Sequence, residues 1–75
     1  MRVTVSAGSW ARRWLPQTTV ELELPESAVV EDVLELICIP SEEVGLFSIN
    51  GKAVPQETAL LEGDAIRVFP LVMGG

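Results

Sequence analysis

The sequence has no histidine and only one cysteine among its 75 residues. It therefore lacks the residues for a Cys/His zinc cluster, for a Cys–His or Ser–His nucleophilic pair and for an internal disulfide. We expect no catalytic residue and no metal site in this chain. A domain of this size buries only about 60% of the surface that its unfolded form exposes, so little is left to enclose an active site. These absences weigh against a self-sufficient enzyme.

Basic residues are also scarce, since five Lys and Arg stand against eleven Asp and Glu, for a net charge of −6. This charge repels phosphate backbones and anionic lipids, so neither nucleic acid nor a membrane is an expected partner. No segment approaches the roughly 20 apolar residues that span a bilayer, and no secretory signal begins the sequence. We expect a cytoplasmic protein, and the lone Cys38 fits a reducing compartment. The acidic surface suits docking on a basic patch of a larger protein, or serves solubility alone.

Strands are predicted wherever apolar and polar residues alternate with period two. The segments of this kind are Arg2–Ser6, Thr18–Leu24, Leu46–Ile49, Lys52–Val54 and Ala65–Phe69. Asn50 and Gly51 between the third and fourth of them can take the positive φ values of a type I′ turn. Pro70 has no N–H to donate, so we expect ladder pairing to stop there and the tail to leave the sheet.

One amphipathic helix is predicted over Ser27–Ile39, before Pro40. Its apolar side chains follow the i, i+3, i+4, i+7 spacing, and acidic side chains lie on the opposite side. The apolar residues are Val30, Val33, Leu34 and Ile37. The sequence therefore predicts a single α+β domain over residues 1–70, with a four- to five-stranded mixed sheet and one main helix packed on one face. Residues 71–75 are expected to form a flexible C-terminal tail.

The connection between the first two strands contains Trp10 and Trp14, which would share a face of a helical turn. Beside Arg12 and Arg13 they could stack on bases next to phosphate contacts. Packing against the core or its edge is favoured, because the chain as a whole is acidic.

The most distinctive feature is the end of the sequence, where an apolar run is followed by Gly74 and Gly75. Five residues beyond Pro70 reach at most about 16 to 18 Å, enough to carry a carboxylate into another protein's cleft. Because glycines have no side chain, they would fit a narrow channel in that protein and could adopt the dihedral angles that the channel imposes. A carboxylate is inert when ionised, but transfer of AMP to it would allow sulfide or a thiolate to attack the acyl carbon. The alternative is a frayed end that happens to contain glycine.

An apolar strip precedes these glycines. Phe69 should point away from the core if Ile66 and Val68 point inward, and further apolar residues follow it. The predicted docking strip consists of Phe69, Leu71, Val72 and Met73. An apolar patch near a chain end is typical of an interface. Alternatively, Phe69 packs beneath a neighbouring loop.

Three motifs occur in a fixed order along the chain. Ser48–Val54 carries Asn-Gly after a strand, Leu60–Asp64 is a Leu-x-x-Gly-Asp turn, and Ile66–Gly75 is a strand with a tail ending in Gly-Gly. Together these segments resemble the ubiquitin-like sulfur carriers of the MoaD/ThiS family, which includes the small subunit of molybdopterin synthase and the thiamin-pathway sulfur carrier. The resemblance covers nearly the whole chain, and the ending Phe69–Gly75 is more similar to the molybdopterin branch.

The resemblance implies a β-grasp fold with the first and last strands parallel at the sheet centre. It also implies that an E1-like enzyme adenylates Gly75 with ATP and magnesium, while Gly74 gives the tail access. Sulfur from a donor such as a cysteine desulfurase or rhodanese would then give a thiocarboxylate. A larger synthase subunit would receive this tail, and the chain itself would bind no cofactor.

Several functions remain open at this point. The favoured one is sulfur donation for molybdopterin, with the chain as a protein cosubstrate. The others are the thiamin-pathway carrier, serving a thiazole synthase, a ubiquitin-like modifier joined through Gly75 to a lysine, and a non-covalent β-grasp interaction module.

Overall fold

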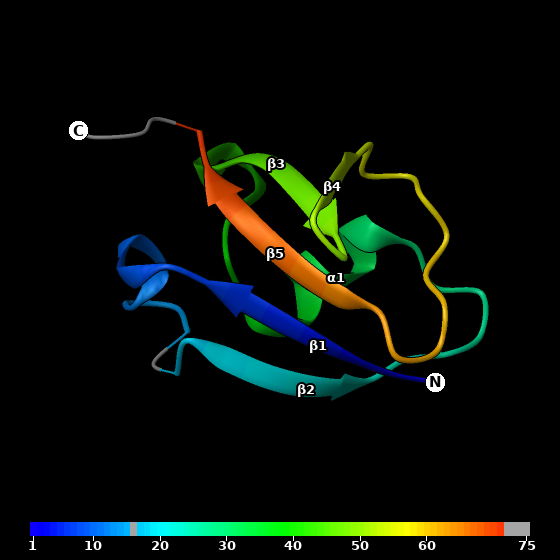
Figure 1. Ribbon diagram of the computed structural model, residues 1–75. Helices are drawn as coiled ribbons and strands as arrows, with labels where there is room; N and C mark the ends of the chain where they lie inside the picture. Colours follow the sequence, from blue (N-terminus) through cyan, green and yellow to red (C-terminus); the bar gives the residue numbers. More distant parts are fainter. Residues whose placement is uncertain (16, 72–75) are drawn as a thin grey trace.

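A mixed five-stranded sheet with one helix across one face makes up the fold in the computed structural model, which describes residues 1–15 and 17–71 (Figure 1). In spatial order the strands are β2 (Thr19–Glu23), β1 (Arg2–Ala7), β5 (Ala65–Pro70), β3 (Val44–Ile49) and β4 (Lys52–Val54). Only β1 and β5 run parallel, and the other neighbouring strands are antiparallel. The α+β prediction and the parallel pairing of the first and last strands are confirmed.

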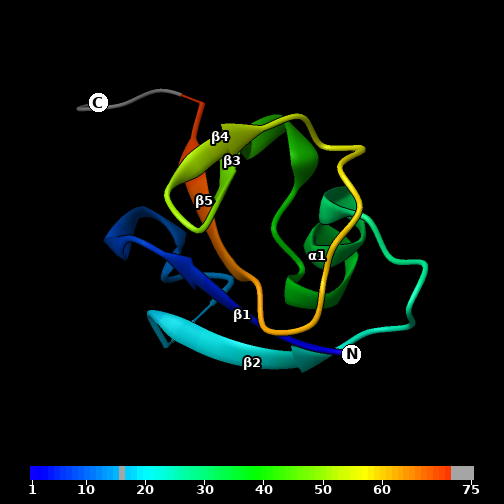
Figure 2. The same cartoon turned by 45° about the vertical axis from the view of Figure 1, so that its right-hand side comes forward.

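The core lies between the sheet and helix α1 (Val30–Ile37), which sits within the curve of the sheet (Figure 2). All four predicted apolar helix residues are buried. They pack with inward-facing strand residues, of which the most completely buried are Val3, Val5, Ile66 and Val68. The period-two and 3.6-residue patterns thus identified the two faces of one core.

Helix α1 is shorter than the predicted Ser27–Ile39. Val29 forms a bridge with Ala59, and the carbonyl of Ala28 accepts from the Leu60 N–H at 3.1 Å, so this part of the chain is extended. The carboxylate of Asp32 then accepts from the Val29 N–H at 2.8 Å and satisfies the first donor of the helix. The helix ends at Cys38, which has a φ of 63°. Long-range pairing, which local periodicity does not reveal, therefore moved the start of the helix.

Strand β3 begins at Val44, two residues earlier than predicted. A 3₁₀ turn, η2 (Ser41–Glu43), precedes it. The register between β3 and β5 shifts between Val44 and Leu46, which places an irregularity at Gly45. Strand β2 is one residue shorter than predicted at each end.

Strand β5 ends one residue later than predicted, because Pro70 itself takes part in the ladder. Pro70 pairs with Val44, and the Leu71 N–H donates to the carbonyl of Glu43 at 3.0 Å. N–H groups point to alternate sides along a strand, so the nitrogen of Pro70 points toward β1 if that of Leu71 points toward β3. Pairing of β5 with β1 has already ended at Ala7–Val68. The missing donor of Pro70 therefore breaks no ladder bond.

Two turns of the predicted motifs are locked together. Asn50 and Gly51 have φ values of 51° and 87°, as the predicted turn requires. The Asn50 Nδ2 donates to Asp64 Oδ1 at 3.3 Å, and the Ala65 N–H donates to Asn50 Oδ1 at 3.1 Å. The other carboxylate oxygen of Asp64 accepts from the Leu61 N–H at 2.8 Å. The Asn-Gly and Gly-Asp motifs thus have a structural role.

None of the helices in the described part of the chain has the length and apolarity to cross a membrane.

Candidate functional site

The candidate site is the end of β5, from which the predicted tail begins. Of the predicted site residues, Phe69 and Leu71 lie within the structure. Val72, Met73, Gly74 and Gly75 lie outside the described residues. Their docking, access and adenylation roles therefore stay predictions, and the geometry below concerns the residues at the base of the tail.

Phe69 lies on the open face of the sheet, opposite to the buried Ile66 and Val68. It is half-buried, and the Arg67 guanidinium carbon is 5.5 Å from its ring centroid. Arg67 shares the open face because it is two residues away on the same strand. The orientation predicted for Phe69 is confirmed, and the contact with Arg67 is a cation–π interaction.

Leu46 extends the predicted strip into an apolar patch. It lies directly opposite Phe69 in the β3–β5 register and is 47% exposed, while Leu71 is 64% exposed. We call Leu46, Phe69 and Leu71 the apolar patch. Sequence reasoning missed Leu46 because it lies beside Phe69 only through strand pairing, and more than 20 residues separate the two along the chain. Apolar side chains exposed together in this way are typical of an interface.

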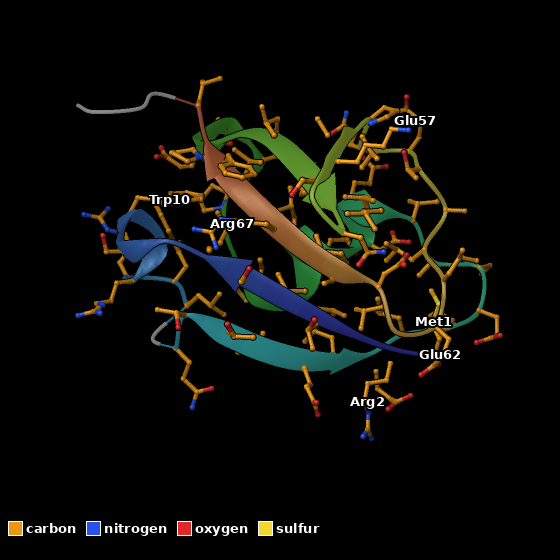
Figure 3. All side chains as sticks on the ribbon, viewed as in Figure 1. Met1, Arg2, Trp10, Glu57, Glu62 and Arg67 are labelled. Atoms are coloured by element: carbon orange, nitrogen blue, oxygen red, sulfur yellow. The ribbon has the colours of Figure 1, made fainter. Side chains whose placement is uncertain are left out.

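The segment between β1 and β2 lies beside the end of β5. It contains the 3₁₀ turn η1 (Ser9–Ala11), and Figure 3 shows Trp10 and Arg67 on the flank of β5 near its C-terminal end. The rings of Trp10 and Trp14 meet edge to face with centroids 6.4 Å apart, and both pack on the core. The guanidinium carbon of Arg13 is 5.3 Å from the Trp14 ring. Packing at the core edge, favoured from the sequence, is confirmed.

A hollow of about 250 Å³ lies between η1 and η2 at the base of the tail. Its lining residues are Trp10, Glu42, Glu43, Pro70 and Leu71. The hydrogen bond from Leu71 to the Glu43 carbonyl ties the base of the tail to η2. We call this feature the tail-base hollow. It was not predictable from the sequence, because its walls come from three segments that are distant along the chain.

Within residues 1–15 and 17–71, no three His, Cys, Asp or Glu side chains are grouped so that they could hold a metal ion. The described site has an apolar patch, two cation–π pairs and an acidic hollow around the end of a central strand. Such a surface can bind a partner and direct the following residues toward it.

Comparison with known proteins places this geometry among ubiquitin-like folds. Residues 9–73 match the family model described as Mut7-C ubiquitin. The putative molybdopterin converting factor subunit 1 of Pyrococcus furiosus has a TM-score of 0.79 and 29% identity, over 96% of this chain and 99% of that chain. SAMP1 of Haloferax volcanii has a TM-score of 0.81 and 22% identity, over 100% of both chains. Urm1 of Trypanosoma brucei has a TM-score of 0.71 and 14% identity, over 99% and 95% of the two chains.

The matches to SAMP1 and Urm1 bear on the fold alone, because their identities are low. Together with the family match and the archaeal subunit, they confirm the predicted β-grasp fold. The resemblance to ubiquitin-like carriers, first recognised from three motifs, is confirmed as well.

Proposed function

Because the chain belongs to the Mut7-C ubiquitin family, we propose that it is a ubiquitin-like sulfur carrier whose reactive group is the Gly75 carboxylate. It acts as a protein cosubstrate in the cytoplasm, and the chemistry takes place in the active sites of its partners. The supporting observation is the end of β5, where a central strand leads to Leu71, a member of the apolar patch. A chain end that follows such a strand is presented from a rigid base, so binding the domain also positions the tail.

The first step is adenylation by an E1-like enzyme that uses ATP and magnesium. A carboxylate oxygen of Gly75 attacks the α-phosphorus of ATP, and pyrophosphate leaves. The acyl carbon of the resulting adenylate is then attacked by hydrosulfide. A thiol releases this hydrosulfide from the persulfide of a sulfur donor such as a cysteine desulfurase or rhodanese, and the thiol and the donor's cysteine are left as a disulfide. The new C–S bond replaces the C–O bond to AMP, AMP and a proton leave, and Gly75 carries a thiocarboxylate.

In these steps the chain provides binding rather than catalysis. The apolar patch docks on the partner, and Gly74 allows the backbone to enter a narrow channel without a side chain. Val72 and Met73 would continue the contact along that channel. The net charge of −6 favours a partner with a basic docking surface.

We assign molybdopterin as the destination of the sulfur, with a larger synthase subunit as the receiving partner. The 29% identity to a putative molybdopterin converting factor subunit supports this assignment, as does the sequence of Phe69–Gly75. Donation to a thiazole synthase and attachment to lysines are the rival outcomes that the experiments below separate.

The decisive experiment combines the purified chain with the E1-like adenylating enzyme of its source organism, ATP, magnesium and sulfide. We expect ATP–pyrophosphate exchange, and an intact mass that corresponds to replacement of one oxygen by sulfur. If neither is seen, the carrier function is refuted. The thiocarboxylated chain is then offered to a molybdopterin synthase large subunit or to a thiazole synthase, and product formation identifies the pathway. A ladder of lysine-linked adducts on denaturing, reducing gels of cell extracts would favour a modifier instead.

A further inference from the structure

Three aromatic side chains lie around the end of β5, and within residues 1–15 and 17–71 a cation lies over two of them. Arg13 lies over Trp14, and Arg67 lies over Phe69. Trp10 has no such contact within residues 1–15 and 17–71. The five other residues, 16 and 72–75, include no Lys or Arg. The ring that lines the tail-base hollow is therefore the one without an intramolecular cation.

Two acidic residues line the same hollow as Trp10. Glu42 and Glu43 are exposed residues of η2. In the described part of the chain, the ion pairs involve Glu23 and Glu26 and not these two residues. An aromatic ring beside carboxylates offers a guanidinium both a stacking surface and charge-assisted hydrogen bonds. The planar guanidinium uses both, whereas the ammonium group of lysine makes only point contacts.

The walls of the hollow are held in place by the fold. Trp14 supports the Trp10 ring edge to face, and Gly8 leaves it room, since a Cβ at Gly8 would be only 3.2 Å from Trp10 Cδ1. On the other side, η2 is tied to Leu71 through the carbonyl of Glu43. A site that exists before binding requires little ordering when the ligand arrives.

We propose that the tail-base hollow binds an arginine side chain of the enzyme that adenylates the tail. Pro70 and Leu71 form one wall of the hollow and lead directly into the tail. A protein that holds the tail therefore brings its own side chains to this place. Identification of the partner rests on the proposed function, whereas selectivity for a guanidinium rests on Trp10, Glu42 and Glu43 alone.

The main test measures the KM for the chain in ATP–pyrophosphate exchange with the E1-like enzyme. We expect the double variant Glu42→Gln/Glu43→Gln to raise this KM about tenfold, with kcat within about twofold, because it removes the charge-assisted bonds. The matched control is Glu31→Gln/Glu35→Gln, which removes the same charge from the exposed side of α1. Trp10→Leu, checked for folding by circular dichroism, removes the stacking surface. If Trp10→Leu does not fold, the double variant Glu42→Gln/Glu43→Gln tests the proposal by itself, because both substituted residues are exposed.

Failure of the proposed arginine site and failure of the proposed carrier function give different results. Equal KM values for the two Gln pairs would mean that only net charge matters and would overturn the arginine site. If the wild-type chain supports no exchange, the carrier function fails, and the hollow is tested by NMR titration with N-acetylarginine methylamide and its citrulline analogue. Shifts of the Trp10 indole N–H and the Leu71 amide with arginine alone support the site. No shifts, or the same shifts with citrulline, refute it.

Discussion

A side chain on Gly45 would collide with the backbone of Pro70, because a Cβ there would lie 2.6 Å from the Pro70 carbonyl oxygen. The same Cβ would be 3.0 Å from the Cα of Leu71. This close approach occurs where the β3–β5 register shifts between Val44 and Leu46. Gly45 thus allows the last residues of β5 to pack on β3, and it sets where the tail begins.

Gly45→Ala should displace the base of the tail. Backbone atoms rather than a flexible side chain oppose the new methyl group, so the strands must separate locally. We expect a loss of about 1 to 3 kcal/mol in the free energy of unfolding, as for other overpacked sites. The Leu71 amide should shift in the NMR spectrum as its bond to Glu43 weakens. Urea denaturation and a ¹H–¹⁵N spectrum measure both effects.

The matched control is Gly51→Ala. A Cβ at Gly51 meets nothing within 4 Å, but the φ of 87° is unfavourable for alanine. This variant should lose about 1 kcal/mol through its backbone alone, and the Leu71 amide should not move. If Gly45→Ala also leaves the Leu71 amide in place, the close approach does not position the tail.

Asp64→Ala should destabilise the fold without touching the tail. Asp64 is buried, and its loss leaves the Leu61 N–H and the Asn50 amide without their acceptor. We expect the free energy of unfolding to fall by about 2 kcal/mol, because two part-buried hydrogen bonds to Asp64 are lost. Glu57→Ala, at an exposed position labelled in Figure 3, should change it by less than about 0.5 kcal/mol. Equal midpoints of urea denaturation for the two variants would contradict a locking role for Asp64.

Features that depend on local preference were predictable from the sequence. The Asn50-Gly51 turn follows from the φ values that these residues tolerate, and the buried side of α1 follows from its 3.6-residue spacing. The outward orientation of Phe69 follows from strand alternation once Ile66 and Val68 are taken as core.

Features that depend on strand register were not predictable. The missing N–H of Pro70 predicts the end of the strand, but the local sequence does not reveal that the pairing of β5 with β1 ends before Pro70. Leu46 lies beside Phe69 only through cross-strand pairing, and Trp10 and Glu42 line one hollow only because η1 and η2 flank the same strand end. The C-terminal motif of the candidate site was therefore predictable from the sequence, whereas the residues around it were placed by the fold.

Phe69→Asp should weaken binding to the partner that receives the tail. The new carboxylate would place a charge in the middle of the apolar patch, where contact with the partner removes water. We expect the affinity for the large synthase subunit to fall by at least about tenfold, measured by isothermal titration calorimetry. Leu61→Asp is the matched control, because Leu61 is 69% exposed and lies outside the patch. Similar losses for both variants would remove the patch as the docking surface.

Deletion of Gly75 should abolish activation while the domain stays folded. The helix, the sheet and the hydrogen bonds described above are formed by residues up to Leu71, so the thermal midpoint should not change. The shortened chain would place its carboxylate one residue short of the attacking position, up to about 3.6 Å away. Pyrophosphate exchange and sulfur incorporation should both fall to background. Gly74→Val keeps the length and the carboxylate but adds a branched side chain, and it should reduce kcat/KM rather than the thermal midpoint. A truncated chain that still gains sulfur would show that Gly75 is not the reactive residue.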